Sequence, residues 1–493
     1  MREDRRRDLW ALAPGLGLAA AYVLVLLALD HLIYFADTCE IFDLAGGLVF
    51  AGHWPLVDTN IFGNFFLGPL TDYLTALPLA ITGHLRPAYY FLWLLYLSSI
   101  PLFYFAVRRH LETPVAAGWA TFWFSWQVVF GELMITPWNT SYLPLFLAAF
   151  TYFLLNKSEG PWLLVLYFII GLCTHLHITS VLLIVAAVIY LATTRRRLVR
   201  DLPWHALGVA IVVGLNASAI WYHFHQQWAA TAVTAHQVKR MALSFDWSTF
   251  VSFLVAGPLL FALPFIVFWW LAPRSSDEKT WFDESSHRRL LLAFVVVDVL
   301  VALIEGVAHK GRFRYYYFFS PFFCLAIGLA ANHFYRVAHR RRKRWAAALL
   351  ALIAIAPLAS VVRTEVDRSY QHLTRNERLA DALHDWLRAS GRVGTTRFVQ
   401  QMYAVQGDQV YLGEINDKCV ETMLRVRYPR DYRWRDEGQL IRIYSFHQVN
   451  EPPTYQVEHY RRQHFDRLQT CPRRIVLEGD EHYVCPSRED QFP

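Results

Sequence analysis

The sequence predicts an all-α polytopic membrane domain, followed by a smaller C-terminal domain of mixed α/β structure. Of the 493 residues, 55% are hydrophobic and 18% are charged, whereas soluble domains typically carry about a quarter charged residues. The charges lie in blocks between apolar runs, several of which approach the roughly 20 residues that a helix needs to cross a bilayer. These observations exclude an ordinary soluble protein. The net charge of +7 does not indicate nucleic-acid binding, because most clustered arginines flank apolar runs and act as topology signals.

The basic blocks predict the direction of eleven transmembrane helices. A basic N-terminus precedes the first apolar run, and further basic blocks follow at 108–110, 195–200, 287–289 and 339–344. Spans that start from a cytoplasmic N-terminus place all of these blocks in the cytoplasm, as the positive-inside rule requires. The expected spans are 12–33, 88–107, 115–131, 142–156, 161–176, 178–194, 205–222, 248–271, 290–307, 316–335 and 345–362.

The apolar stretch 64–82 is left out of these spans. A span here would move the basic block at 108–110 to the outside, and the stretch contains Pro69, Asp72 and Pro78. We therefore expect it to lie along the outer membrane surface, as an interfacial helix of the first outer loop.

Residues 1–362 are thus expected to form the membrane domain and residues 363–493 an extracytoplasmic domain. The second domain begins with a helical pattern at 375–391 and continues with strand-like stretches at 408–415 and 473–485. Four of the six cysteines lie in the expected outer segments, where disulfides persist, and four cysteines allow three pairings. The four are Cys39, Cys419, Cys471 and Cys485, and the last two flank a predicted hairpin, which makes them the first expected pair.

Three acids recur at every third position where the chain enters the first outer loop: Asp37, Glu40 and Asp43. In a helix they would share one broad side. An exposed carboxylate row, favoured by the helix dipole, is the simpler interpretation for Glu40 and Asp43. Asp37 differs because it lies where the chain leaves the bilayer, and a carboxylate near a low dielectric can be tuned as a general base.

Other polar side chains lie in the outer turns. Asn139 is in the turn at 131–144, while His175 and His177 lie at the junction of two spans. A His-x-His pair can bind a divalent metal, but no carboxylate stands at a fixed spacing from it, so interfacial anchoring is the competing interpretation. No cofactor is required by any pattern in the sequence.

Lys310, Arg312 and Arg314 form the densest cation cluster in any outer interspan loop, beside a run of tyrosines and phenylalanines. The positive-inside rule predicts few cations on that side. General attraction to anionic lipid, or snorkelling of span-end side chains, would explain them. We favour a specific phosphate or diphosphate site, because arginine offers a bidentate fork and lysine a compact charge.

The segments "DTCEIFDLAGGLVFAGHWP", "WNTSYLPLF", "GLCTHLHITSVLL" and "RYYYFFSPF", with the Pro-containing surface helix, resemble the GT-C superfamily of membrane glycosyltransferases. The nearest group is the bacterial protein O-mannosyltransferase-like and aminoarabinose-transferase-like one, and the resemblance covers residues 12–335. It implies that Asp37 is the catalytic acid of the first loop and Asp43 a second frequent acid. Gly68 and His175 depart from it, because aminoarabinose transferases have lysine at both places.

The resemblance implies an inverting glycosyltransferase on the extracytoplasmic face of the bacterial inner membrane. The donor would be a polyprenyl-phosphate-linked sugar and the acceptor a hydroxyl group of a lipid, glycan or protein. Lys310, Arg312, Arg314 and His175 would bind the lipid phosphate, and the substrate cavity would contain Glu40, Asn139 and His177. A polytopic transporter or lipid flippase is the alternative; such proteins commonly show internal repeats, which are not evident here, and only Asp298 favours it.

Overall fold

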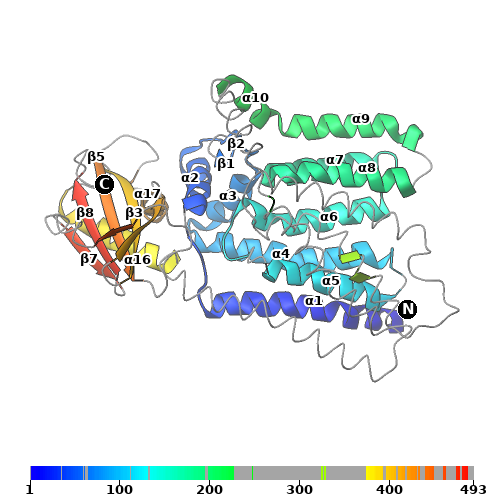
Figure 1. Cartoon of the computed structure of the whole chain (residues 1–493), viewed down its shortest axis with the longest axis horizontal. Helices are drawn as coiled ribbons and strands as arrows, with labels where there is room; N and C mark the ends of the chain where they lie inside the picture. Colours follow the sequence, from blue (N-terminus) through cyan, green and yellow to red (C-terminus); the bar gives the residue numbers. More distant parts are fainter. Residues whose placement is uncertain are drawn as a thin grey trace.

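The computed structural model describes residues 2–34, 36–58, 60–61, 65–111, 113–130, 134–194, 198–226, 247, 324–325, 327–328, 373–391, 396–406, 409–416, 419–429, 431–432, 439–448, 459–461, 473–477 and 480–486. They form a helical bundle with an α/β unit at one end, and the N-terminus lies at the opposite end of the bundle (Figure 1). The expected spans 248–271, 290–307 and 345–362 lie outside the described residues, as does all but a few residues of 316–335.

Seven helices of the bundle occupy the positions of the first seven expected spans. The first two long ones are antiparallel, because Arg108 binds Asp8 at 2.8 Å at one end of the pair and Arg86 binds Asp30 at 2.8 Å at the other. By length and hydropathy, two described helices could cross a membrane, Arg6–Ala28 and Arg86–Arg108, and Trp162–Leu176 and Leu182–Ala192 are shorter apolar helices. The seven are α1 (Arg2–Ala28), α4 (Arg86–Arg108), α5 (Pro114–Phe130), α6 (Leu143–Asn156), α7 (Trp162–Leu176), α8 (Leu182–Thr194) and α9 (Leu198–Leu215).

The seventh helix differs from its expected bounds of 205–222. It begins at Leu198 and ends at Leu215, and a turn at Asn216 separates it from α10 (Ala217–Gln226). Asp201 in the first turn of α9 is buried, and a carboxylate is favoured there by the helix dipole. Arg200 and Asp201 are therefore part of α9 rather than of a preceding loop.

Small residues let the bundle helices approach closely. A Cβ on Gly118 of α5 would lie 2.5 Å from the Ala11 carbonyl oxygen of α1, and one on Gly15 would lie 3.2 Å from Thr121. Small residues at such crossings are typical of helices packed within membranes. Large apolar side chains such as Leu24, 63% exposed, lie on the outside of α1.

The segment between α1 and α4, the expected first outer loop, forms short elements at the end of the bundle that faces the α/β unit (Figure 1). They are α2 (Ala36–Ala51), an antiparallel pair of β1 (Asn60–Ile61) and β2 (Phe65–Phe66), and α3 (Leu70–Thr82). With 13 residues, α3 is too short to cross about 30 Å of hydrocarbon. Two 3₁₀ turns lie at the ends of bundle helices, η1 (Asn139–Tyr142) before α6 and η2 (Ile178–Val181) before α8.

The described part of segment 363–493 contains both helices and strands. The helices are α16 (Leu373–Ala389) and α17 (Cys419–Arg427), and the strands are β3 (Thr396–Gln406), β4 (Gln409–Asn416), β5 (Gln439–Gln448), β6 (His459–Arg461), β7 (Arg473–Leu477) and β8 (Asp480–Pro486). They make one six-stranded sheet of order β6-β4-β3-β5-β8-β7, in which β3 and β5 are parallel and the other pairs antiparallel. α17 contacts β3 and α16 contacts β7, and the buried Leu383 and Met423 lie on these two helices.

A disulfide joins the first outer loop to the C-terminal segment. Cys39 on α2 and Cys419 on α17 are bonded, with their Cα atoms 4.8 Å apart, across 380 residues of sequence. Among the three pairings of four outer cysteines, this bond is compatible only with Cys471–Cys485. Cys471 lies outside the described residues, so the second bond stays a prediction.

We expect Cys39→Ser to destabilise the purified protein by about 2–5 kcal/mol, the usual cost of losing a native disulfide. Thermal unfolding in detergent, with and without reductant, measures this cost. Cys173→Ser is the control, because Cys173 is a free buried thiol and its replacement should leave the response to reductant unchanged. Mass mapping without reductant that finds Cys39 as a free thiol would contradict the assignment.

Candidate active site

Asp37, the expected base, is the second residue of α2. Its side chain lies outside the described part of the structure, whereas its backbone belongs to the first turn of this helix. The free N–H groups of a first helical turn favour a negative charge beside them. Residue 37 therefore stands at the end of the bundle, just after the chain has left α1 at Ala28.

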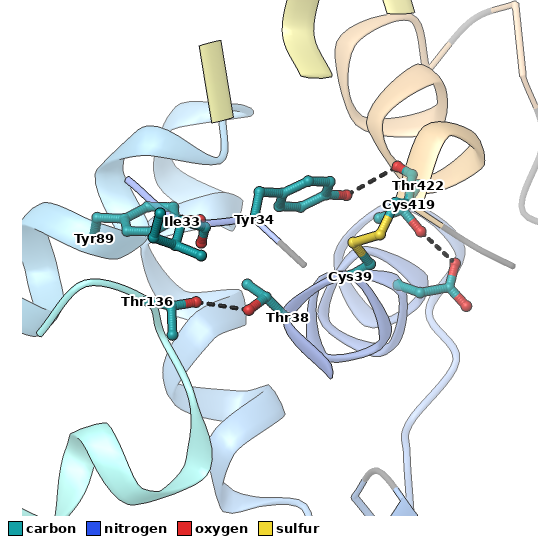
Figure 2. Close-up of a disulfide and its surroundings, with 9 residues drawn as sticks. Ile33, Tyr34, Thr38, Cys39, Tyr89, Thr136, Cys419 and Thr422 are labelled. Carbon is teal, nitrogen blue, oxygen red and sulfur yellow. Dashed lines mark hydrogen bonds between the residues drawn. A yellow bond between two sulfur atoms is a disulfide. The ribbon is translucent and has the colours of Figure 1, made fainter. Parts of the chain in front are cut away.

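The chain entering α2 is fixed to the bundle by buried hydrogen bonds (Figure 2). Thr38 Oγ1 and Thr136 Oγ1 lie 2.6 Å apart. Just before the helix, the Ile33 N–H donates to the Ile135 carbonyl at 3.0 Å, and the Tyr89 hydroxyl of α4 donates to the Ile33 carbonyl at 2.8 Å. The start of α2 is thus held by α4 and by the loop that follows α5.

Asp43, expected as a second acid, contacts the C-terminal segment instead of water. Its Oδ1 accepts from Arg425 Nη1 and from Thr422 Oγ1, each at 3.3 Å. The Arg425 side chain is 7% exposed and that of Asp43 is 14% exposed, and Arg425 also pairs with Glu421. The interpretation of an exposed carboxylate row is therefore wrong for Asp43, whose charge is balanced by α17.

Two buried carboxyl groups beside α2 were not identified as site residues from the sequence: Asp58 is 2% exposed and Asp72 is fully buried. In the described part of the chain neither carboxyl oxygen of Asp72 has a hydrogen-bond partner, and the Asp58 carboxyl acts on it electrostatically. Burial raises the pKa of Asp72 well above its ordinary value, and the charges of Asp58 and Glu40 raise it further. Burial and like charge therefore favour the neutral form of Asp72 over its carboxylate.

In the sequence, Asp72 stands out as a charged residue inside an apolar stretch. It lies in the first turn of α3, and its charge there argues against a transmembrane span. The partly buried Glu40 of α2 acts electrostatically on it. The acids of α2 therefore have different neighbours: Asp43 contacts α17, whereas Glu40 lies near α3.

Asn139 and His177, expected to contribute to the substrate cavity, are both buried. Asn139 Oδ1 accepts the next backbone N–H at 2.8 Å at the start of η1. The His177 N–H donates to the Cys173 carbonyl at 2.9 Å and ends α7. The other end of η1 reaches α3, since the Tyr142 hydroxyl lies 2.9 Å from Thr75 Oγ1. A role for Asn139 and His177 in substrate binding stays a prediction.

Gly68 and His175, the two departures from the aminoarabinose transferases, contact each other. A Cβ on residue 68 would lie 2.4 Å from the ring of His175, on the Nδ1 side. His175 Nε2 lies 2.8 Å from the Leu215 carbonyl oxygen, which can only accept, so Nε2 carries a hydrogen. The ring is therefore anchored on one side and pressed against glycine on the other.

Lys310, Arg312 and Arg314 lie outside the described residues, as does Asp298. The phosphate site therefore stays a prediction. In the described part of the chain, no three His, Cys, Asp or Glu side chains come together in a way that could hold a metal ion.

We expect Gly68→Ala to destabilise the protein by about 1–3 kcal/mol, because the new methyl group would overlap the anchored His175 ring. In a His175→Ala background the overlap is gone, so the same change should cost less, and a double-mutant cycle by thermal unfolding measures the coupling. Gly17→Ala is the matched control, since a Cβ there meets nothing within 4 Å. Equal costs of Gly68→Ala in both backgrounds would show that the ring does not exclude a side chain at residue 68.

Asp72→Asn should remove a pH-dependent loss of stability. Above pH about 4 an unfolded Asp72 has lost its proton while the folded one keeps it, so wild-type stability falls as pH rises toward the raised pKa. Asparagine has no proton to lose, and its amide can still donate to Asp58. Thermal unfolding from mildly acidic to mildly alkaline pH should give a shallower slope for the variant; parallel slopes would contradict the raised pKa of Asp72.

The chain is similar to one protein-family model and to solved structures. Residues 67–221 match the family model described as dolichyl-phosphate-mannose-protein mannosyltransferase. The crystal structure of ArnT from Cupriavidus metallidurans in the apo state matches with a TM-score of 0.53 and 12% identity, covering 95% of this chain and 97% of that chain.

The crystal structure of the same ArnT bound to undecaprenyl phosphate gives a TM-score of 0.42 at 12% identity, with 96% of this chain and 98% of that chain covered. A comparison with curated protein sequences gives no match. The family model over 67–221 and the fold shared with apo ArnT together confirm the resemblance of this chain to the GT-C superfamily of membrane glycosyltransferases.

Proposed function

We propose that the protein is an inverting glycosyltransferase that moves a sugar from a polyprenyl-phosphate donor to a hydroxyl acceptor. The observation that carries this proposal is the start of α2, where residue 37 stands at the end of a GT-C-type bundle and is held by α4, by the loop after α5 and by α17. The description of the matching family, a transferase that uses dolichyl-phosphate mannose, supports a lipid-phosphate donor. The reaction would occur on the extracytoplasmic face of the bacterial inner membrane.

In this mechanism the Asp37 carboxylate takes the proton of the acceptor hydroxyl as its oxygen attacks the anomeric carbon. The bond between that carbon and the phosphate oxygen breaks, and the polyprenyl phosphate leaves with the bonding electrons. The products are a glycoside of inverted configuration, the lipid phosphate and a protonated Asp37, which returns its proton to water. No resident cofactor is needed for these steps.

Charge must be balanced where the phosphate leaves, and preorganised cations lower this barrier most effectively. Lys310, Arg312 and Arg314 are our proposed phosphate ligands. His175 could contribute only Nδ1, because its Nε2 is bound to the Leu215 carbonyl. The described acids near α2 cannot serve this purpose, since a carboxyl group is either negative or neutral.

Asp37→Asn should abolish transfer while leaving the fold intact, because the amide preserves size but cannot accept the proton. The measurement is transfer by purified protein from a panel of radiolabelled polyprenyl-phosphate sugars to a hydroxyl acceptor. Asp8→Asn is the matched control: Asp8 binds Arg108 at the opposite end of the bundle, and this variant should keep transfer.

Undiminished transfer by Asp37→Asn would remove the catalytic assignment. A transporter or flippase would give no glycosylated product with any donor of the panel, and would instead move labelled lipid across proteoliposome membranes.

A further inference from the structure

Helices α2 and α17 are joined along matching faces (Figure 2). On α2, Cys39 and Asp43 are four residues apart and therefore lie on the same side, one turn from each other. Their partners on α17 are Cys419, which forms the disulfide, and Arg425, which binds Asp43. The Tyr34 hydroxyl adds a third tie, donating to the Cys419 carbonyl at 3.0 Å. Helices α2 and α17 are thus joined by a disulfide and an ion pair, with the Tyr34 hydrogen bond beside them.

Arg425 lies between two carboxylates in this contact. It binds Asp43 of α2 at 3.3 Å and Glu421 of its own helix. All three side chains are at most 14% exposed. Removing the guanidinium would take away the cation that Asp43 and Glu421 share, which weakens the attachment of α2 to α17.

A change at Asp43 is transmitted to residue 37 because both belong to one 16-residue helix. Six residues of helix span about 9 Å, and such a segment moves as a unit. A misplacement of roughly 1 Å can cost about a hundredfold in rate when a reacting group must meet its partner. The C-terminal segment therefore helps to set the position of the first turn of α2, together with the hydrogen bonds from α4 and from the loop after α5.

We propose that Arg425 is a positioning residue for the transfer reaction: from the C-terminal segment it holds Asp43, and through α2 it places Asp37 at the acceptor hydroxyl. This inference rests on the proposed function. In this proposal Asp43 attaches α2 to Arg425 of α17 and is not a second catalytic acid.

The test is steady-state transfer by the full-length protein, with the radiolabelled polyprenyl-phosphate sugar that the wild type uses. Arg425→Ala should lower kcat by about tenfold or more and leave the donor KM within about twofold, because the base is displaced while donor contacts remain. Arg425→Lys should recover part of kcat, since it restores the charge without the fork geometry.

Arg427→Ala is the matched control on the same helix. Arg427 binds Asp381 of α16 at 2.7 Å and not α2, so this variant should keep kcat within about twofold. Thermal unfolding and mass mapping of the Cys39–Cys419 bond verify that each variant is folded. If Arg425→Ala does not fold, the comparison of Arg425→Lys with Arg427→Lys replaces it, with a lower kcat expected for the former alone.

A double-mutant cycle separates positioning from catalysis by Asp43. If Asp43 acts only through Arg425, Asp43→Asn combined with Arg425→Ala should be no slower than Arg425→Ala alone. Multiplied losses in the double variant, an effect on KM alone, or equal kcat values for Arg425→Ala and Arg427→Ala would each overturn the inference. Absence of transfer by the wild type would instead overturn the proposed function on which the inference rests.

Discussion

The arrangement of the candidate site depends on the attachment of α2 to α17. The disulfide between Cys39 and Cys419 closes a loop of 380 residues, and such a link restricts the unfolded chain more strongly as the loop lengthens. Beside it, the Asp43–Arg425 ion pair is nearly buried, so loss of one partner is costly because the other charge stays in a poorly hydrated place. The disulfide and the ion pair thereby fix α2 between the helical bundle and the C-terminal segment.

The acids between α1 and α4 fall into two groups that differ in the charges around them. Asp43 is balanced by Arg425, whereas Glu40 lies near Asp58 and Asp72. Burial and the neighbouring carboxylates raise the pKa of Asp72, and the neutral form that this favours reduces the repulsion among three carboxyl groups. A leaving phosphate would be repelled from this side of α2, so the cations that receive it must approach from another direction. The loop around Arg312 is the candidate that the sequence offers.

Local sequence pattern predicted much of the fold. Apolar runs placed the helices from α1 to α9, the prolines and charge of 64–82 argued for a short helix instead of a span, and the three-residue spacing of acids suited a helical α2. Periodicity shows which side of a segment is apolar, but it does not show which distant segments meet. For this reason the sequence left open the partner of Cys39 and used Asp72 only to argue against a span.

The contact between Gly68 and His175 shows how the structure alters the meaning of a sequence difference. Compared position by position, they are two separate losses of a lysine expected from the resemblance. In space they are one feature, because the ring of residue 175 occupies the volume that any side chain on residue 68 would need. Restoring lysine at residue 68 alone is therefore incompatible with the present ring, whose Nε2 is anchored to Leu215. The two differences therefore form one coupled change in packing, in which residues 68 and 175 do not supply the two lysine charges that the resemblance implies.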